Sequence, residues 1–299
     1  MKSLTICILI FIFSATGLSQ NALREIKEAE LSFINTARNA GPKQAFLAFL
    51  SADAVVFQPT AVNGLSVWQQ MENSSVILER TPIFADISSN GVFGYTTGHW
   101  KSSLSETTDS AKFGQYVTIW QRSETGSFKI ALDITTTHEE ISVKLLDKLR
   151  RSGKPPRDKN KKGPSAADAT MDFFRLGNNQ NQLGGAYEKY SSGSVRLLID
   201  GDEPVYGKKD AVYKMSRYRS MEFPTKIAML EAADMAYVWN PCEFDNSAEG
   251  KENGSCLHIW KLQNKRWWLV VGVFTLANNG PSAPPQLHDV SPKNTNGTS

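Results

Sequence analysis

Aromatic and charged side chains gather on strand-like segments late in the first half of the chain. Because side chains alternate between the two faces of a strand, Tyr116 and Trp120 share one face of their segment. By the same rule, Lys129 and Asp133 share one face of the next segment. Aromatic area beside a few convergent polar groups is typical of a ligand pocket. We therefore predict that these four side chains and Tyr95 line a ligand-binding site, while an outer face carrying an ion pair is the alternative.

Three side chains are candidates for acid–base catalysis. Asp133 is a lone acid at the end of an otherwise apolar strand, so it needs a partner or solvent. His99 lies on a strand and is of the residue type that most often moves protons, although a surface position explains it equally well. Glu203 stands with Asp200 and Asp202 before a proline, where a buried carboxylate could act as a general base. The same run is also ordinary for a polar turn.

The sequence contains no motif for a metal or a cofactor. The histidines are not spaced as metal ligands, either with one another or with the cysteines. A glycine-rich nucleotide motif and the Gly-x-Ser-x-Gly segment of many hydrolases are also missing from the sequence. We therefore expect neither a metal ion nor a cofactor. The histidines considered are His99, His138, His258 and His288.

The N-terminus reads as a secretory signal peptide. Lys2 is followed by a nearly continuous apolar run over 4–13 and then by small and polar residues, with cleavage placed before or after Gln20. We predict that residues 1–20 are removed and that the protein is exported, to the periplasm or the outside; an uncleaved anchor is the alternative. Beyond this segment no apolar run is long enough to span a bilayer.

Removing the signal peptide leaves two cysteines, Cys242 and Cys256. They flank a polar segment that reads as a hairpin loop, and positions across a hairpin can meet disulfide geometry. An exported cysteine pair is free to oxidise. We predict a structural disulfide between them, with two free thiols as the alternative.

The chain repeats itself. Elements and short motifs of the first half recur in the second at a nearly constant offset, with the small drifts that loop insertions produce. We predict two tandem domains, 21–143 and 165–277, which could pack on each other as a built-in dimer. The best-matched pairs are Tyr95 with Tyr237, Trp120 with Trp260 and Phe128 with Trp267, at offsets of 142, 140 and 139 residues.

The charge pattern argues against a nucleic-acid partner. The 299 residues carry 33 Lys and Arg against 30 Asp and Glu, a formal net charge of +3. Nine Lys and Arg against two Asp fall in the segment 144–164, which has no aromatic residue to stack on a base. We predict an exposed linker there, with anion binding as the alternative, and a disordered tail over 278–299.

Each half is predicted to be an α+β domain. In the first half, apolar spacing favours a helix over 22–37, short helices through 46–50 and 67–73, and then a series of strands. The second half gives the same order of elements. Helices first and a strand meander last predict two cone-shaped domains, each a curved antiparallel sheet wrapped on about three helices around a conical pocket. The expected strands are 54–57, 83–87, 92–100, 112–122 and 128–135.

The order of these elements, with the short motifs inside them, resembles the nuclear transport factor 2-like superfamily, which includes the SnoaL-like and ketosteroid-isomerase-like domains. The first half is most similar to a secreted branch of unknown function. The likeness covers 22–135 well and 165–276 more loosely, because Gly272 stands where the first half has Asp133. The motifs that carry it are Ala45-Phe46-Leu47, Ala52-Asp53-Ala54-Val55, Gly64, the segment 82–85, Gly94-Tyr95-Thr96-Thr97-Gly98 with Trp100, Gly114-Gln115-Tyr116 with Trp120, and the segment 126–133.

The resemblance leaves function open, since the superfamily holds isomerases, dehydratases, cyclases, hydrolases and non-catalytic domains. Its ketosteroid-isomerase-like enzymes carry a carboxylate base before a proline. The matching residues are Gln58, which cannot accept a proton at neutral pH, and Glu203. Three functions remain: binding of a small, partly apolar molecule; an isomerase, dehydratase or hydrolase using a pocket acid; and a non-catalytic assembly module.

Overall fold

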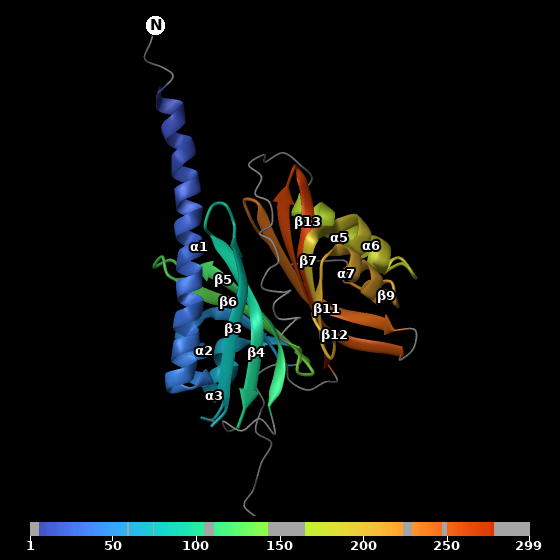
Figure 1. Ribbon diagram of the computed structural model, residues 1–299, viewed down its shortest axis with the longest axis horizontal. Helices are drawn as coiled ribbons and strands as arrows, with labels where there is room; N and C mark the ends of the chain where they lie inside the picture. The colour runs from blue at the N-terminus through green and yellow to red at the C-terminus, as the bar shows by residue number, and fades with distance from the viewer. Residues whose placement is uncertain are drawn as a thin grey trace, which may run out of the picture.

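The computed structural model describes residues 6–58, 60–73, 75–104, 111–142, 165–223, 229–246 and 250–277, with side chains described from residue 20 onward (Figure 1). The predicted linker 144–164 and tail 278–299 lie outside these residues. Among the described residues, no helix combines the length and the apolar character needed to cross a membrane.

The first half forms a six-stranded sheet covered on one face by helices. Its strands lie side by side in the order β2-β1-β6-β5-β4-β3. The predicted helices and strands are all present, and several of them extend beyond the predicted limits. The elements are α1 (Ile6–Ala40), α2 (Pro42–Phe49), β1 (Leu50–Phe57), β2 (Ala61–Asn63), α3 (Gly64–Gln70), β3 (Ile77–Ile87), β4 (Phe93–Ser103), β5 (Lys112–Arg122) and β6 (Phe128–His138).

The second half has the same architecture, with the strand order β8-β7-β13-β12-β11-β10 and β9 paired to β11. Its first helix begins with the capping box that the sequence predicts, in which the Asp168 amide donates to Ser165 Oγ at 3.0 Å. The elements are α5 (Ala166–Gly177), α6 (Leu183–Tyr190), β7 (Ser191–Ile199), β8 (Val205–Tyr206), α7 (Lys208–Met215), β9 (Tyr218–Glu222), β10 (Met229–Ala232), β11 (Met235–Asn246), β12 (Gly250–Gln263) and β13 (Arg266–Leu276).

The fold is therefore α+β in two halves, but each sheet is mixed rather than antiparallel. β1 pairs with β6 in parallel, and β7 pairs with β13 in parallel. The reason is the path of the chain between the two strands. After β1 the chain forms β2 and α3 and then β3 to β5, and only β6 comes to lie beside β1, on the side opposite β2. A strand that is rejoined by such a crossover can run parallel to its neighbour.

Both sheets carry a β-bulge at the same place. In the first half Trp120 pairs with Ile130 and Ile119 with Leu132, so Ala131 is an extra residue. In the second half Trp260 pairs with Leu269 and Ile259 with Val271, so Val270 is the extra residue. Because of the extra residue, two side chains on either side of the bulge that would share a face in a regular strand lie on opposite faces of the sheet.

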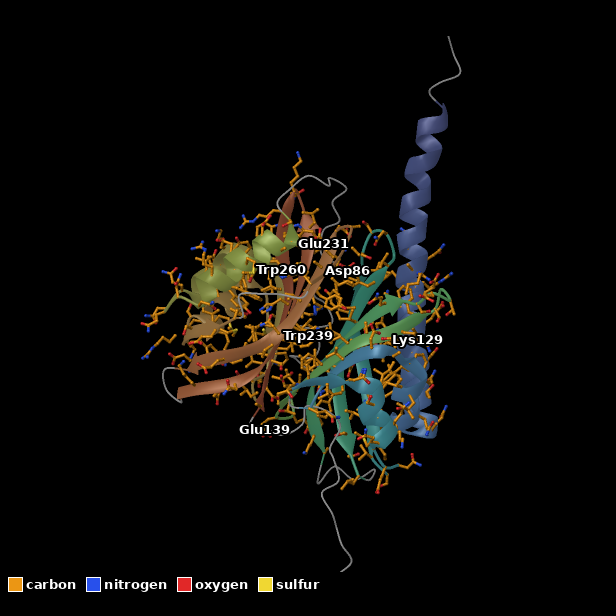
Figure 2. The ribbon with its side chains drawn as sticks, turned by 180° about the vertical axis from the view of Figure 1, so that it is seen from behind. Asp86, Lys129, Glu139, Glu231, Trp239 and Trp260 are labelled. Atoms are coloured by element: carbon orange, nitrogen blue, oxygen red, sulfur yellow. The ribbon has the colours of Figure 1, made fainter. Side chains whose placement is uncertain are left out.

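The two sheets pack against each other through the faces that their helices leave open (Figure 1). We call this side of each sheet the junction face and the opposite side the helix face. Aromatic edges cross the junction, with ring centroids 5.8 Å apart for Phe57 and Trp239 and 5.3 Å apart for Phe93 and Tyr237. Figure 2 shows Trp239 between the two halves. The buried core of the junction includes Tyr95, Val117, Ile119, Leu132, Ile134, Leu198, Leu257, Ile259, Val271 and Val273.

A buried ion cluster crosses the same junction. Lys261 Nζ of the second half lies 3.3 Å from Asp86 Oδ2 of the first and 3.5 Å from Asp234 Oδ2, and donates to the Ile87 carbonyl at 2.8 Å. The Ser89 amide donates to Asp234 Oδ1 at 2.7 Å. The Lys261 side chain is 1% exposed, so these charges are removed from water and depend on one another.

Removing the cation should loosen this junction. Lys261→Met leaves Asp86 and Asp234 buried without their partner, and we expect a loss of about 3–5 kcal/mol in the free energy of unfolding, measured by urea denaturation. Lys251→Met is the control, because that lysine pairs with carboxylates on the surface and should matter little. Equal, small losses in both variants would show that the cluster does not hold the halves together.

Candidate functional site

Three of the predicted ligand-site residues meet on the helix face of the first half. Asp133 forms a two-point ion pair with Arg80, with Nη1 to Oδ1 at 3.1 Å and Nη2 to Oδ2 at 2.8 Å. Thr118 Oγ1 donates to Asp133 Oδ1 at 2.5 Å. Tyr116 and Trp120 are fully buried beside them. The lone acid thus has the partner that its position demands, and that partner, Arg80, is absent from the sequence prediction.

The Arg80 guanidinium lies among aromatic rings. Its Cζ is 4.8 Å from the ring centroid of Phe33, 5.5 Å from that of Phe46 and 4.4 Å from that of Tyr116. Burial opposes the charge, but the charge and hydrogen bonds of Asp133 outweigh it and raise the pKa of Arg80. Rings above a cation add attraction that a desolvated site strengthens. The guanidinium and its neighbours therefore occupy the interior that the sequence predicts as a conical pocket.

A second carboxylate, Glu30 of α1, completes the cluster. Thr96 Oγ1 donates to Glu30 Oε2 at 2.5 Å and Trp120 Nε1 donates to the same oxygen at 3.3 Å. Burial raises the pKa of Glu30, and the nearby Arg80 only partly offsets this. Arg80 lies near two acids, Glu30 and Asp133, and both of its hydrogen bonds to a carboxylate are made with Asp133. Burial therefore weighs against the charged form of Glu30.

The sequence contains a signal for Glu30, although Glu30 is not among the predicted site residues. It lies on the apolar stripe of α1, four residues after Ile26 and three before Phe33, both fully buried. An acid on the buried stripe of a helix must find a partner inside the protein. Arg80 gives a weaker signal, because arginines are common on strands at the edge of a sheet.

Two predicted residues lie elsewhere. Tyr95 faces the junction, where its ring packs 5.9 Å from that of Phe84. Lys129 reaches out instead to the Ala48 carbonyl at 2.7 Å, and Figure 2 shows it on the outer side of the first half. The bulge at Ala131 explains the error: it puts Asp133 on the helix face and separates it from Lys129.

The second half replaces this whole cluster. Strand register and helix position identify the corresponding residues, and none of them is an acid or an arginine. Phe223, in the place of Arg80, stacks on Phe174 with ring centroids 4.0 Å apart. In the second half, Thr170, Phe223, Cys256, His258 and Gly272 stand for Glu30, Arg80, Tyr116, Thr118 and Asp133.

An open cavity of about 130 Å³ lies at the end of β3 to β6 remote from the β5–β6 hairpin. It brings together residues from both faces of the sheet, because the sheet ends there. His99, a sequence-predicted candidate, is half-buried in its wall. Figure 2 shows Glu139, which follows β6, at this end of the junction. The main lining residues are Glu79, His99, Trp100, Phe113, His138 and Glu140.

The two histidines of the cavity are held by one buried amide. Gln115 Nε2 lies 2.5 Å from His99 Nδ1 and 3.0 Å from His138 Nε2, and His138 Nδ1 lies 2.6 Å from the Glu139 carbonyl. Neutral rings satisfy all three contacts when Gln115 donates to both histidines and His138 donates to Glu139. Burial lowers the pKa of His138, although the Glu139 carbonyl and the charge of Glu203 act in the opposite direction. The imidazoles are thus fixed in orientation.

The second half contributes to the same end of the first sheet. Asp200 Oδ1, at the end of β7, accepts from the Thr137 amide at 2.7 Å and from Thr137 Oγ1 at 2.6 Å. Glu203 is in the turn after it, close enough for its charge to act on His138. Glu203 therefore lies near His138, while Asp133 lies inside the first half. Gln58 follows β1 directly, as expected.

The described residues contain no group of three or more side chains suited to hold a metal ion. Cys242 and Cys256 are both buried and stand as free thiols. Their predicted oxidation to a disulfide remains a prediction.

No protein-family model and no curated protein matches the sequence. Solved structures match over about two fifths of the chain. An NTF2-like protein from Cytophaga hutchinsonii is 18% identical, with a TM-score of 0.32, over 38% of this chain and 99% of that chain. A ketosteroid isomerase-like protein from Erwinia carotovora atroseptica is 16% identical, with a TM-score of 0.32, over 38% and 95%. An NTF2-like protein of unknown function from Pseudomonas putida is 12% identical, with a TM-score of 0.33, over 39% and 87%.

The two buried acids should respond differently to neutral substitution. Asp133→Asn breaks the ion pair and leaves Arg80 buried, so we expect a loss of about 3–5 kcal/mol in the free energy of unfolding. Glu30→Gln removes a charge that burial already disfavours, and we expect a loss below about 1 kcal/mol. Chemical denaturation at neutral pH compares them. A larger loss for Glu30→Gln would contradict the assignment of the charges.

His138 should make stability depend on pH. Its pKa is lowered in the folded state, so below the unfolded value of about 6.5 the unfolded chain binds more protons. Stability is then full above that pH and falls as the pH drops below it, by at most about 1.4 kcal/mol per pH unit for this one group. The free energy of unfolding, measured by denaturation at several pH values between 7.5 and 5.0, should change less with pH for His138→Gln than for the unchanged chain. Parallel pH profiles would contradict this.

Proposed function

We propose that this chain is a non-catalytic binding protein, whose ligand is a small, partly apolar molecule bound at the open end of the first sheet. The observation that carries the proposal is the cavity there, with two imidazoles fixed by Gln115 beside the aromatic walls of Trp100 and Phe113. Prealigned polar groups in a partly apolar cavity are the usual composition of a small-molecule site. The site differs from the conical interior predicted from the sequence.

The filled interior argues against the enzyme alternative. Asp133 is committed to Arg80, and Glu30 is 1% exposed behind aromatic side chains. A catalytic acid must reach its substrate within hydrogen-bond distance. In addition, the resemblance would place a carboxylate base at position 58, but the residue there is Gln58, which cannot accept a proton at neutral pH. These acids support the fold rather than a reaction.

Size and charge narrow the ligand class. A cavity of about 130 Å³ is smaller than the roughly 300–1,000 Å³ of a drug-sized site. Its rim carries Glu79 and Glu140 against the one lysine, Lys101, and Glu203 adds a further negative charge nearby. This balance favours a neutral or cationic ligand over an anionic one. A small aromatic or aliphatic amine fits both the charge and the walls.

A second function, assembly, is favoured by the junction itself. We infer that the halves are tandem copies, because strand order and bulges recur, and that they pack as a built-in dimer. In this role the paired sheets form a rigid body whose outer helices are available to other partners. The two functions are compatible, since the cavity lies at the edge of the junction.

We further propose that the protein is exported and works without residues 1–20, in the periplasm or outside the cell. The short apolar run after Lys2 and the small residues that follow it support this. We expect no bound metal or cofactor and no nucleic-acid partner.

A matched pair of ligands tests the binding proposal. Benzylamine and benzoate each carry one phenyl ring, are similar in size and are opposite in charge, and we expect only the amine to raise the melting temperature of the protein. Glu140→Gln should weaken amine binding about two- to fivefold, the weight of one exposed charge pair. Glu124→Gln is the control, because Glu124 lies in the turn at the other end of the β5–β6 hairpin.

Titration followed by NMR would locate the ligand. Shifts at His99 and His138 support the site. Stabilisation by benzoate and benzylamine alike, or an equal response of Glu140→Gln and Glu124→Gln, would overturn the charge argument. If no small compound binds at this end of the sheet, assembly is left as the function.

A further inference from the structure

The ion cluster at the junction contains a nucleophile as well as charges. Lys261 Nζ lies 3.3 Å from Asp86 Oδ2 and 3.5 Å from Asp234 Oδ2, and all three side chains are buried. Asp86 ends β3 of the first half, on the side that faces the second half (Figure 2), whereas Lys261 and Asp234 belong to β12 and to the turn before β11. A primary amine of one half is therefore in contact with a carboxyl group of the other, inside the protein.

Burial distinguishes Lys261 from the other paired lysines. Its side chain is 1% exposed, whereas the lysines of the other ion pairs among the described residues are between 20% and 57% exposed. The buried pair of Arg80 with Asp133 differs in its chemistry, because a guanidinium stays protonated and is not a nucleophile. Within the described part of the chain, a buried amine that contacts a buried carboxyl group is thus found at the junction alone. The exposed lysines are Lys189, Lys208, Lys214 and Lys251.

Backbone groups hold the three side chains in place. Lys261 Nζ donates to the Ile87 carbonyl at 2.8 Å, and the Ile87 amide donates to Asp86 Oδ1 at 2.9 Å. The Ser89 amide donates to Asp234 Oδ1 at 2.7 Å. Asp86 Oδ2, the oxygen next to the amine, accepts no hydrogen bond from the described residues. One side of the Asp86 carboxyl group is therefore fixed, and the other side is left to Lys261.

Condensation of the amine with the acid would relieve the cost of burying their charges. A cation and a carboxylate removed from water each carry a large desolvation penalty, which their attraction offsets only in part. An amide is neutral and costs far less to bury. Groups held in contact also react as an intramolecular pair, which removes much of the entropic barrier.

We propose that Lys261 and Asp86 form an isopeptide bond, which joins the two halves covalently. The ammonium first passes a proton to the Asp86 carboxylate, so that a neutral amine faces a neutral carboxyl group. The nitrogen lone pair then attacks Asp86 Cγ, and a C–N bond forms. Asp234 takes a proton from the nitrogen and gives it to the departing hydroxyl group, which leaves as water.

The reaction needs no co-reactant. The ammonium supplies three hydrogen atoms, of which two leave in the water together with one oxygen of Asp86, and the third stays on the amide nitrogen. No atom is oxidised or reduced, and Asp234 returns to its original state. The charges of Lys261 and Asp86 disappear together.

The bond would do what an ion pair cannot do. It would close a covalent loop from β3 to β12, so the two halves could not separate even in the unfolded chain. Salt and acid weaken ionic contacts but leave an amide intact. The bond does not involve the ligand site at the open end of the first sheet, so this proposal and the binding proposal can fail independently.

Mass spectrometry of the full chain tests the proposal without any substitution. After N-terminal sequencing has identified the first residue, we expect the denatured chain to be lighter than its sequence by one water. Trypsin should not cleave after the acylated Lys261, and should release the peptide 252–265 joined to the peptide 81–101. A mass equal to that of the sequence, or a bond from Lys261 to Asp234 in place of Asp86, would overturn the proposal.

Lys261→Arg is the matched control, because it keeps the positive charge and removes the nucleophile. This variant should have the full mass of its sequence. Lys251→Arg, which changes a lysine paired with acids on the surface, should lack one water as the unchanged chain does. If Lys261→Arg also lacked a water, that water would come from another site and the proposal would be wrong.

Asp234→Asn tests the proton transfer. An amide cannot carry the proton, so we expect the bond to form at least about tenfold more slowly, seen as a smaller linked fraction in fresh protein that rises on storage. A linked fraction equal to that of the unchanged chain would contradict the role of Asp234. Should this variant fail to fold, the mass of the unchanged chain and its joined peptides still decide whether the bond exists.

Discussion

The structure depends on the need to bury two faces of each sheet. Helices cover one face in each half, and the other face is apolar along its central strands. A surface of that kind in water would be an unusually large exposed patch. Each half supplies the cover for the other, and Lys261 fixes their register through Asp86 and Asp234. The junction in turn holds the turn after β7 against the end of β6, where Asp200 accepts from Thr137 beside the edge cavity.

The interiors under the helices show two solutions to one problem. A polar group placed there must find its partner inside the protein. The first half solves this with Arg80 between aromatic rings and two acids. The second half keeps the same strand register and the same bulge, yet it has Cys256 and His258 in an aromatic wall. The backbone is shared, so the difference in chemistry comes from a handful of side chains.

The sequence predicted the elements well because both periodicities were strong. The helix stripe through Ile26 and Phe33 and the long alternating strands left few other choices. The face of the sheet on which each side chain lies was harder to predict. The bulge at Ala131 depends on pairing across strands, which no single segment reveals, and it separated Lys129 from Asp133. The parallel pairing of β1 with β6 is a property of the whole sheet and was missed for the same reason.

The place of the cavity also follows from the packing. Inside the first half a polar side chain bears the full cost of burial, so Arg80, Asp133 and Glu30 are tied to one another and to their neighbours and have little left for a ligand. At the centre of the junction the side chains are apolar. Only where the sheet ends can a group such as His138 be oriented by the protein and still face an opening. A chain that fills both interiors therefore leaves the sheet edge as the natural position for a binding site.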